Sequence, residues 1–258
     1  VTTCGSHDTP SPVPGIPAET FQPLFLSSGT WSLLGRELNA PLVNNETLGE
    51  GFSNEQGLCN TTRFLKNVAG MWLLQECLRN WKARGFASDY GTLVEQAREA
   101  QTTLLLNPDA PEFAKPCDMP AAICAYAEKT GQPVPKSPGE FTRAILESLA
   151  LRYRQLVMRL RQWMPDLPDT LHIVGGGSQN NLLNQMTADA TGLRVMAGPV
   201  EATAAGNILA QLMATGAIGS LEEGRAIIRR SFEPRIFEPR DTGIWEEKAA
   251  RFERLTAP

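Results

Sequence analysis

The segment LHIVGGGSQNNLLNQMTADATGLRVMA, Leu171–Ala197, decides the fold class. Its apolar start predicts a strand over Leu171–Val174, which leads into three glycines and a helix from about Asn180 to Ala190. A second strand is expected over Leu193–Ala197. Strands that alternate with helices in this way indicate an α/β fold.

The rest of the chain extends this pattern. The apolar run Leu24–Leu26, the turn Ser27–Thr30 and the run Trp31–Gly35 predict two strands joined by a tight turn. Apolar residues at helical spacing predict one long, largely buried helix from Thr61 to about Arg84. Other helices are expected over Asp89–Gln101, Ser137–Met164 and Ala202–Thr215, from Ser220 onward, and over Thr242–Leu255.

Local signals qualify three of these segments. Ser137 and Ser220 each precede a Glu three residues later, the pattern of a helix capping box. The mixed charges of the last helix predict a solvated surface element, and prolines between Pro10 and Pro17 predict an extended connector. No linker divides the sequence, so we expect a single domain over residues 1–258.

Composition excludes several classes of protein. The 258 residues are 42% hydrophobic and 20% charged, with a net charge of −4, so no basic face for nucleic acid is required. The sequence holds no apolar run of about 18 residues, which excludes a membrane-spanning helix. Five irregularly spaced cysteines and two histidines argue against a disulfide framework or a zinc site and favour reduced, mostly buried thiols. A chain that opens on Val1 without a leader is expected to be cytoplasmic and to start within a longer protein or after processing.

The first candidate for chemistry is the polar stretch Ser6-His7-Asp8-Thr9. It cannot be a hydrolase triad, because side chains on adjacent residues diverge whereas a triad converges from separate segments. Asp8 could act as a general base if it lies within hydrogen-bond reach of a substrate hydroxyl. An ordinary solvent-exposed loop is the alternative interpretation.

Two glycine-containing turns are candidates for binding phosphate. In Ser28-Gly29-Thr30 the glycine lets backbone amides point into one site and the hydroxyl adds a donor, although an ordinary hairpin turn has the same sequence. The loop Gly175-Gly176-Gly177 lies between a strand and a helix start, where a nucleotide can approach the backbone closely. It is neither a Walker A loop nor a dinucleotide fingerprint, since no Gly-Lys-Ser/Thr follows and Asn180 stands at the third glycine position. A tight structural turn remains the alternative.

Two amides interrupt the apolar run of the predicted long helix. Asn67 and Gln75 would lie about 12 Å apart along its axis, a separation comparable to the reach of a nucleotide triphosphate from a small substrate. Buried amides need partners, which a ligand or neighbouring backbone groups could supply.

Taken in order, these segments resemble the C-terminal half of the FGGY carbohydrate kinases, and within that family the members that act on L-rhamnulose. The resemblance rests on His7-Asp8-Thr9, LSSGTWSLLG (Leu26–Gly35), FLKNVAGMWLLQ (Phe64–Gln75), IVGGGSQNNLLNQMTADATG (Ile173–Gly192) and GPVEATAAGNI (Gly198–Ile208). It covers the chain from about residue 4 to about residue 238. It implies an actin-like (ribonuclease H-like) ATPase fold and phosphoryl transfer from ATP to the 1-hydroxyl of L-rhamnulose.

The resemblance also implies roles for individual residues. Asp8 would be the catalytic base, and His7, Asp8, Thr9 and Asn67 would bind the sugar. ATP would lie along Thr30 at its terminal phosphate, Gln75, and Gly176 on its adenosine side. Phosphoryl transfer depends mainly on positioning and charge stabilisation, so a base, donor-rich loops and Mg²⁺ suffice.

The sequence departs from the family pattern in two ways. Pro12 and Pro14 follow the proposed base where relatives more often carry Ala, Ile or Val, which could shift Asp8. Nothing in the sequence matches the family's N-terminal domain, which supplies the rest of the sugar pocket and the acidic residues near Mg²⁺. The resemblance therefore implies a half-enzyme, inactive or weakly active alone, that packs against its own N-terminal domain. The net charge and composition predict that it binds neither nucleic acid nor membrane. L-fuculose or another ketose as substrate, a non-catalytic nucleotide-binding or sensor module, and a dinucleotide-dependent oxidoreductase are the alternatives.

Overall fold

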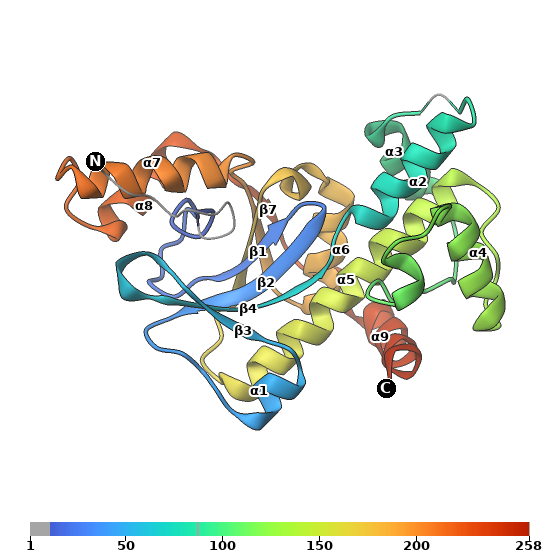
Figure 1. Cartoon of the computed structure of the whole chain (residues 1–258), viewed down its shortest axis with the longest axis horizontal. Coiled ribbons are helices and arrows are strands. Elements are labelled where there is room, and N and C mark those ends of the chain that lie inside the picture. Colours follow the sequence, from blue (N-terminus) through green and yellow to red (C-terminus); the bar gives the residue numbers. More distant parts are fainter. Residues whose placement is uncertain (1–10, 87, 258) are drawn as a thin grey trace. The chain divides into compact units, whose positions relative to one another are not determined.

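The computed structural model describes residues 11–86 and 88–257, whose strands form one seven-stranded sheet and whose other regular elements are helices (Figure 1). The strands are β1 (Leu24–Ser28), β2 (Trp31–Leu38), β3 (Ser53–Gln56), β4 (Thr62–Ala69), β5 (Thr170–Val174), β6 (Arg194–Ala197) and β7 (Arg235–Phe237). The helices are α1 (Asn45–Gly49), α2 (Trp72–Ala83), α3 (Tyr90–Glu99), α4 (Met119–Lys129), α5 (Pro138–Trp163), α6 (Asn181–Thr191), α7 (Ala202–Ala214), α8 (Leu221–Ser231) and α9 (Thr242–Thr256). Short 3₁₀ turns occur at η1 (Leu58–Asn60), η2 (Pro111–Phe113) and η3 (Gly176–Gln179).

The sheet is mixed, in the order β3-β4-β2-β1-β5-β6-β7. β1 forms a hairpin with β2 and pairs in parallel with β5, which in turn pairs in parallel with β6. The carboxyl ends of β1, β5 and β6 therefore lie at one edge of the sheet. This arrangement confirms the predicted α/β fold and the predicted hairpin.

Residue contacts gather in two compact units, each assembled from separate stretches of chain. Unit 1 holds the described residues up to Asn67 together with Arg159–Gln179 and Leu193–Glu238, and it contains the sheet. Unit 2 holds Val68–Met158, Asn180–Gly192 and the stretch from Pro239 onward, and it contains α2, α3, α4, α6 and α9. Because neither unit is a continuous stretch of sequence, no single linker marks a boundary between them.

Unit 1 is held by apolar packing on the sheet. One cluster of buried side chains joins the segment before β1, three strands and the start of α7: Val13, Ile16, Ala18, Phe25, Leu65, Val174 and Ala202. A second group is aromatic, with the Phe52 and Phe64 rings stacked at 4.9 Å and the Trp163 ring edge-on to Phe52 at 5.1 Å. Such pairs contribute about 0.5–1.5 kcal/mol each beyond the area they bury.

Unit 2 has its own core. The Trp81 ring of α2 meets the Phe141 ring of α5 at 5.7 Å, and Phe113 packs against Tyr126 of α4 at 5.2 Å. The last helix, α9, contributes Trp245, Ala249 and Phe252, all buried. The predicted surface helix is thus exposed along most of its length, but it also carries a stripe of buried apolar residues at i, i+4 and i+7 that its mixed charges did not indicate.

The predicted long helix over Thr61–Arg84 is also wrong. Residues 62–69 form strand β4, and only Trp72–Ala83 is helical. Residues 62–65 are all buried in succession, a pattern that strands and helices share over short runs. Pairing with β3 decides for the strand, and Gly70 separates it from α2.

Two further predictions need correction. The proline-rich segment from residue 11 to residue 18 is buried and forms turns, with the Ile16 amide donating to the Val13 carbonyl at 3.2 Å, rather than an extended connector. Proline suits turn positions, and Val13 and Ile16 draw the segment into the core. The four described cysteines are free, but only Cys77 is buried, and Cys59 and Cys117 are exposed.

Both predicted capping motifs begin helices. At α5 the Ser137 hydroxyl accepts from the Glu140 amide at 3.3 Å, while the Glu140 carboxylate accepts from the Lys136 amide at 2.9 Å. At α8, Ser220 and Glu223 repeat this arrangement, and the carboxylate again takes the amide one residue before the serine. The glutamates thus satisfy a different amide from that of the standard box. Across the described residues, no helix combines the length and apolar character needed to cross a membrane.

Candidate nucleotide-binding site

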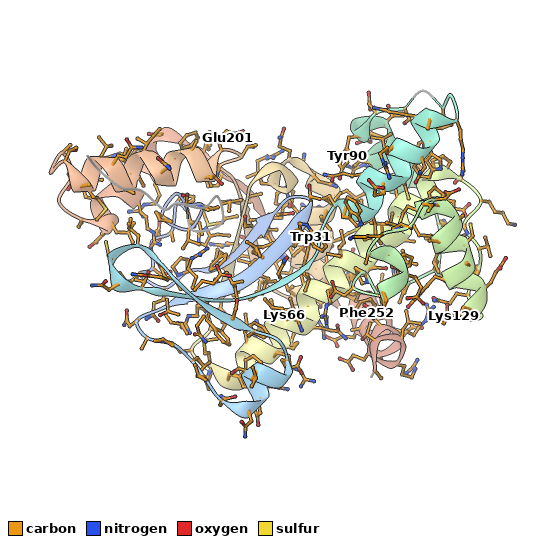
Figure 2. All side chains as sticks on the ribbon, viewed as in Figure 1. Trp31, Lys66, Tyr90, Lys129, Glu201 and Phe252 are labelled. Atoms are coloured by element: carbon orange, nitrogen blue, oxygen red, sulfur yellow. The ribbon has the colours of Figure 1, made fainter. Side chains whose placement is uncertain are left out.

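The turn between β1 and β2 projects from the middle of the unit 1 sheet. Its Gly29 amide donates to the Trp31 carbonyl at 3.0 Å, which closes the turn and leaves Thr30 exposed. Ser28 is 2% exposed, and its hydroxyl has no hydrogen-bond partner among the described residues. Trp31 follows with 53% exposure (Figure 2). β1, which leads into the turn, is hydrogen-bonded to β2 on one side and to β5 on the other, so the start of the turn is fixed in the sheet.

The three glycines after β5 differ in whether the surrounding protein leaves room for a side chain. Gly175 has a φ of +85°, which a side chain would strain, and a Cβ there would lie 2.9 Å from the Ser28 carbonyl oxygen. A Cβ on Gly177 would lie 2.6 Å from the Ser28 Cβ and closer still to its hydroxyl. A Cβ on Gly176 would meet no atom within 4 Å, and Gly176 is exposed. The packing of the protein therefore explains Gly175 and Gly177 but not Gly176, where open space lies over the backbone.

A third loop joins the same edge of the sheet. The Gly198 amide donates to the Ile173 carbonyl at 2.8 Å, and the Gly175 amide donates to the Pro199 carbonyl at 3.3 Å. Helix α7 starts directly after this loop, and its N-cap residue Glu201, labelled in Figure 2, makes no side-chain capping bond. The first amides of a helix carry partial positive charge that favours anions. In the sequence, only the resemblance marked residues 198–201, because the groups bonded to Gly198 and Pro199 lie more than 20 residues away in the chain.

The edge can thus offer backbone donors and a hydroxyl to an anionic ligand. Thr30 supplies the hydroxyl, and the exposed backbone at Gly176 and the first amides of α7 supply N–H groups, whereas the Gly29 and Gly175 amides are already bonded within the protein. Behind it, burial and, to a lesser extent, the positive charge of Arg225 lower the pKa of His172 on β5 to about 4. The imidazole is therefore neutral at pH 7 and carries no charge into this edge.

The predicted site residues fall into three groups. Thr30 and Gly176 lie at the same edge of the unit 1 sheet, as the ATP hypothesis requires. Asn67 is exposed on β4, and Gln75 is exposed in the first turn of α2, within unit 2. The prediction that these two amides are buried on one helix about 12 Å apart is therefore wrong, because a strand carries the first and a helix the second.

The remaining predicted residues, His7, Asp8 and Thr9, lie outside the described residues. Within residues 11–86 and 88–257 there is no group of three or more His, Cys, Asp or Glu side chains that could hold a metal ion.

This mixed sheet with its helices is the actin-like ATPase fold, which solved structures of sugar kinases share. Solved structures with this fold include xylulose kinase from Rhodospirillum rubrum, with a TM-score of 0.69 at 15% identity over 97% of this chain and 50% of that one. Glycerol kinase from Plasmodium falciparum gives a TM-score of 0.68 at 15% identity over 96% of this chain and 49% of that one.

The sequence places the chain within this class. Residues 24–215 match the C-terminal domain of the FGGY family of carbohydrate kinases, and the chain belongs to that family. The rhamnulokinase of Bacteroides thetaiotaomicron is 45% identical over 247 residues, 95% of this chain and 50% of the relative. The rhamnulokinase of Pectobacterium atrosepticum is 41% identical over 259 residues, all of this chain and 51% of the relative. The chain spans about half the length of the curated relatives it matches.

Proposed function

We propose that this chain is the nucleotide-binding half of an ATP-dependent kinase that phosphorylates L-rhamnulose at its 1-hydroxyl. The observation that carries the proposal is the 41–45% identity to rhamnulokinases over nearly the whole chain. The geometry of the sheet edge supports it, because Thr30 is exposed and the space over Gly176 is open where a nucleotide would lie.

In the proposed reaction, Asp8 takes the proton of the sugar 1-hydroxyl as the oxygen attacks the terminal phosphorus of ATP. The new bond joins that oxygen to phosphorus, and the bond between phosphorus and the bridging oxygen of ADP breaks. Thr30 donates to the terminal phosphate, and Gln75 and Gly176 bind the remainder of ATP. His7, Thr9 and Asn67 hold the sugar beside the base.

Catalysis by these residues consists of positioning and charge stabilisation. ATP enters as its Mg²⁺ complex, in which the metal neutralises charge on the phosphates. We propose that the metal ligands, the rest of the sugar pocket and a packing partner for this chain come from an N-terminal domain, as the double length of the relatives suggests.

The experiment uses the whole protein that carries this chain. ADP release is measured with L-rhamnulose, with L-fuculose and without sugar, first for the unmodified protein and then for Asp8→Asn. A general base typically contributes about 10²–10⁴-fold, so Asp8→Asn should lower kcat by that factor and leave ATP affinity within about twofold. Asp166→Asn, which changes an exposed carboxylate paired with Arg36, is the matched control and should keep the kcat of the unmodified protein.

The outcomes separate the alternatives. Normal kcat in Asp8→Asn would remove that residue from the role of base. A higher kcat/KM for L-fuculose than for L-rhamnulose would change the assigned ketose. ATP binding without turnover of any sugar would favour a sensor module, and thermal protection by NAD but not by ATP would favour an oxidoreductase.

A further inference from the structure

The segment from residue 11 to residue 21 lies between the proposed base and β1, and it is unusually well anchored. Its turns include the Ile16 amide donating to Val13 and the Ala18 amide donating to Ile16, at 3.2 and 2.8 Å. Val13 and Ile16 are 1% and 0% exposed. A segment that only connected two parts of the chain would not need this degree of burial.

Two glycines allow the segment to approach the start of α7 closely. A Cβ on Gly15 would lie 3.1 Å from the Gly206 amide nitrogen and closer still to the Ala202 carbonyl oxygen. A Cβ on Gly206 would lie 3.0 Å from the Gly15 amide nitrogen and closer still to the Ser11 carbonyl oxygen. The backbones of the segment and of α7 therefore touch directly, with no side chain between them.

A buried arginine fixes both ends of the same segment. Arg225 of α8 donates from Nη1 to the Phe21 carbonyl at 3.1 Å and from Nη2 to the Val13 carbonyl at 3.3 Å. The same Nη2 donates to Glu37 Oε2 at 2.6 Å. Arg225 and Glu37 are 3% and 1% exposed in this pair. One turn further along α8, Arg229 donates to the Ala18 carbonyl.

A contribution to the stability of the fold does not by itself explain why Arg225 and Glu37 form a buried ion pair. Taking both charges out of water is costly, and apolar side chains of similar volume often replace a buried ion pair without loss of stability. Glu37 also accepts from the Thr61 hydroxyl at 2.8 Å, so its carboxylate is itself held in place. What apolar packing cannot supply is a set of directional bonds to chosen carbonyl groups, here those of Val13 and Phe21.

We propose that Arg225, held by Glu37, is a positioning residue that fixes the backbone of residues 13–21, the stretch of chain that leads from the catalytic base to β1, and that kcat depends on this anchoring. The inference rests on the proposed function, in which Asp8 is that base. Asp8 lies outside the described residues and precedes Ser11 by three positions in the sequence.

The test combines Arg225→Met with Glu37→Leu in the whole protein. Apolar side chains fill the space of the pair, so the melting temperature should return close to that of the unmodified protein, while the bonds to Val13 and Phe21 are lost. The Thr61 hydroxyl keeps the Leu58 carbonyl as its acceptor at 2.8 Å. We expect kcat to fall about 10–100-fold, as for a misplaced catalytic group, with KM for ATP within twofold. Amide hydrogen exchange at Ile16 and Ala18 should become faster.

Two further variants make the result specific. Leu209→Ala, in the apolar cluster of Leu209, Ile218 and Ile228, should lower the melting temperature and leave kcat unchanged, because it keeps the bonds from Arg225 to Val13 and Phe21. Arg225→Lys keeps the charge beside Glu37 but lacks the fork that reaches two carbonyls, so it should recover only part of kcat.

Three results would overturn the inference: unchanged exchange at Ile16 and Ala18 in the double variant, kcat in that variant equal to that of the unmodified protein, or a loss of kcat in Leu209→Ala as large as the loss in the double variant. Asp8→Asn, assayed alongside, distinguishes these from failure of the proposed function, because normal kcat in that variant would reject the base itself.

Discussion

The contact between Gly177 and Ser28 allows a quantitative prediction for Gly177→Ala. The added Cβ would lie 2.6 Å from the Ser28 Cβ and 3.1 Å from its carbonyl oxygen. Rotating the Ser28 side chain cannot relieve the clash, because neither of these atoms moves with χ1. The strand cannot shift freely either, because β1 is bonded to β2 and β5 along its length.

The expected cost is that of an overpacked core, about 2 kcal/mol. For a protein of this size that corresponds to a fall in melting temperature of about 4–8 °C. Since Ser28 begins the turn that carries Thr30, ATP affinity should fall as well. Thermal unfolding followed by circular dichroism, with and without ATP, measures both effects on this chain.

A compensating variant tests the cause. Ser28→Gly combined with Gly177→Ala removes the Ser28 Cβ and hydroxyl, the two nearest atoms, and leaves the Ser28 carbonyl oxygen at 3.1 Å. It should recover most of the lost stability, less about 0.5–1 kcal/mol for a glycine within a strand. An unchanged melting temperature in Gly177→Ala, or no recovery in the double variant, would refute the packing argument.

Three other predictions follow from the same structure. Gly176→Ala should leave the melting temperature unchanged, because a Cβ there meets no atom within 4 Å, yet weaken ATP binding at least tenfold by calorimetry; unchanged affinity would contradict its role. Burial lowers the pKa of His172 from 6.5 to about 4. Between these two pH values the imidazole is protonated in the unfolded chain but not in the folded one, so the free energy of unfolding should fall by up to about 3 kcal/mol as the pH falls from 6.5 to 4. Urea titrations should show this slope reduced in His172→Gln. This chain alone should phosphorylate little or no L-rhamnulose, and ordinary kinase turnover would contradict the half-enzyme proposal.

Local signals predict the elements that they specify directly. The segment from Leu171 to Ala197 contains a strand, a glycine loop, a helix and a strand as expected, because its apolar runs and glycines lie in sequence order. Capping residues placed the starts of α5 and α8 for the same reason: the groups that satisfy a helix's free amides are its immediate neighbours.

Non-local pairing accounts for the error over residues 61–84. β4 pairs with β2 and β3 in the sheet, and its run of buried residues looks the same in sequence as the apolar face of a helix. The only local signal was Gly70, which is tolerated in helices at a cost of about 1 kcal/mol and so does not by itself end one. Helix α4 was not predicted, although Asp118 is a good N-cap residue. The apolar residues that follow it form only a short segment with weak helical spacing.

The candidate site follows the same division. Thr30 and Gly176 could be proposed from their own turns, whereas the contacts that bring those turns together could not. The resemblance to the family depended on the order of separate motifs, and the structure gives that order a physical meaning within unit 1. Ser28 of the motif Leu26–Gly35 touches Gly177 of the glycine loop, and the loop bonds to Pro199 of the motif Gly198–Ile208. Gly206 of that last motif touches the segment that follows the proposed base. In each of these contacts a backbone group or a glycine stands where a side chain would not fit, so the spacing of small residues in the sequence marks where the chain approaches itself. Gly176 is the exception, because a Cβ at this position would meet no atom of the described chain within 4 Å. Gly176→Ala is therefore the substitution that most directly tests whether a nucleotide lies over this loop.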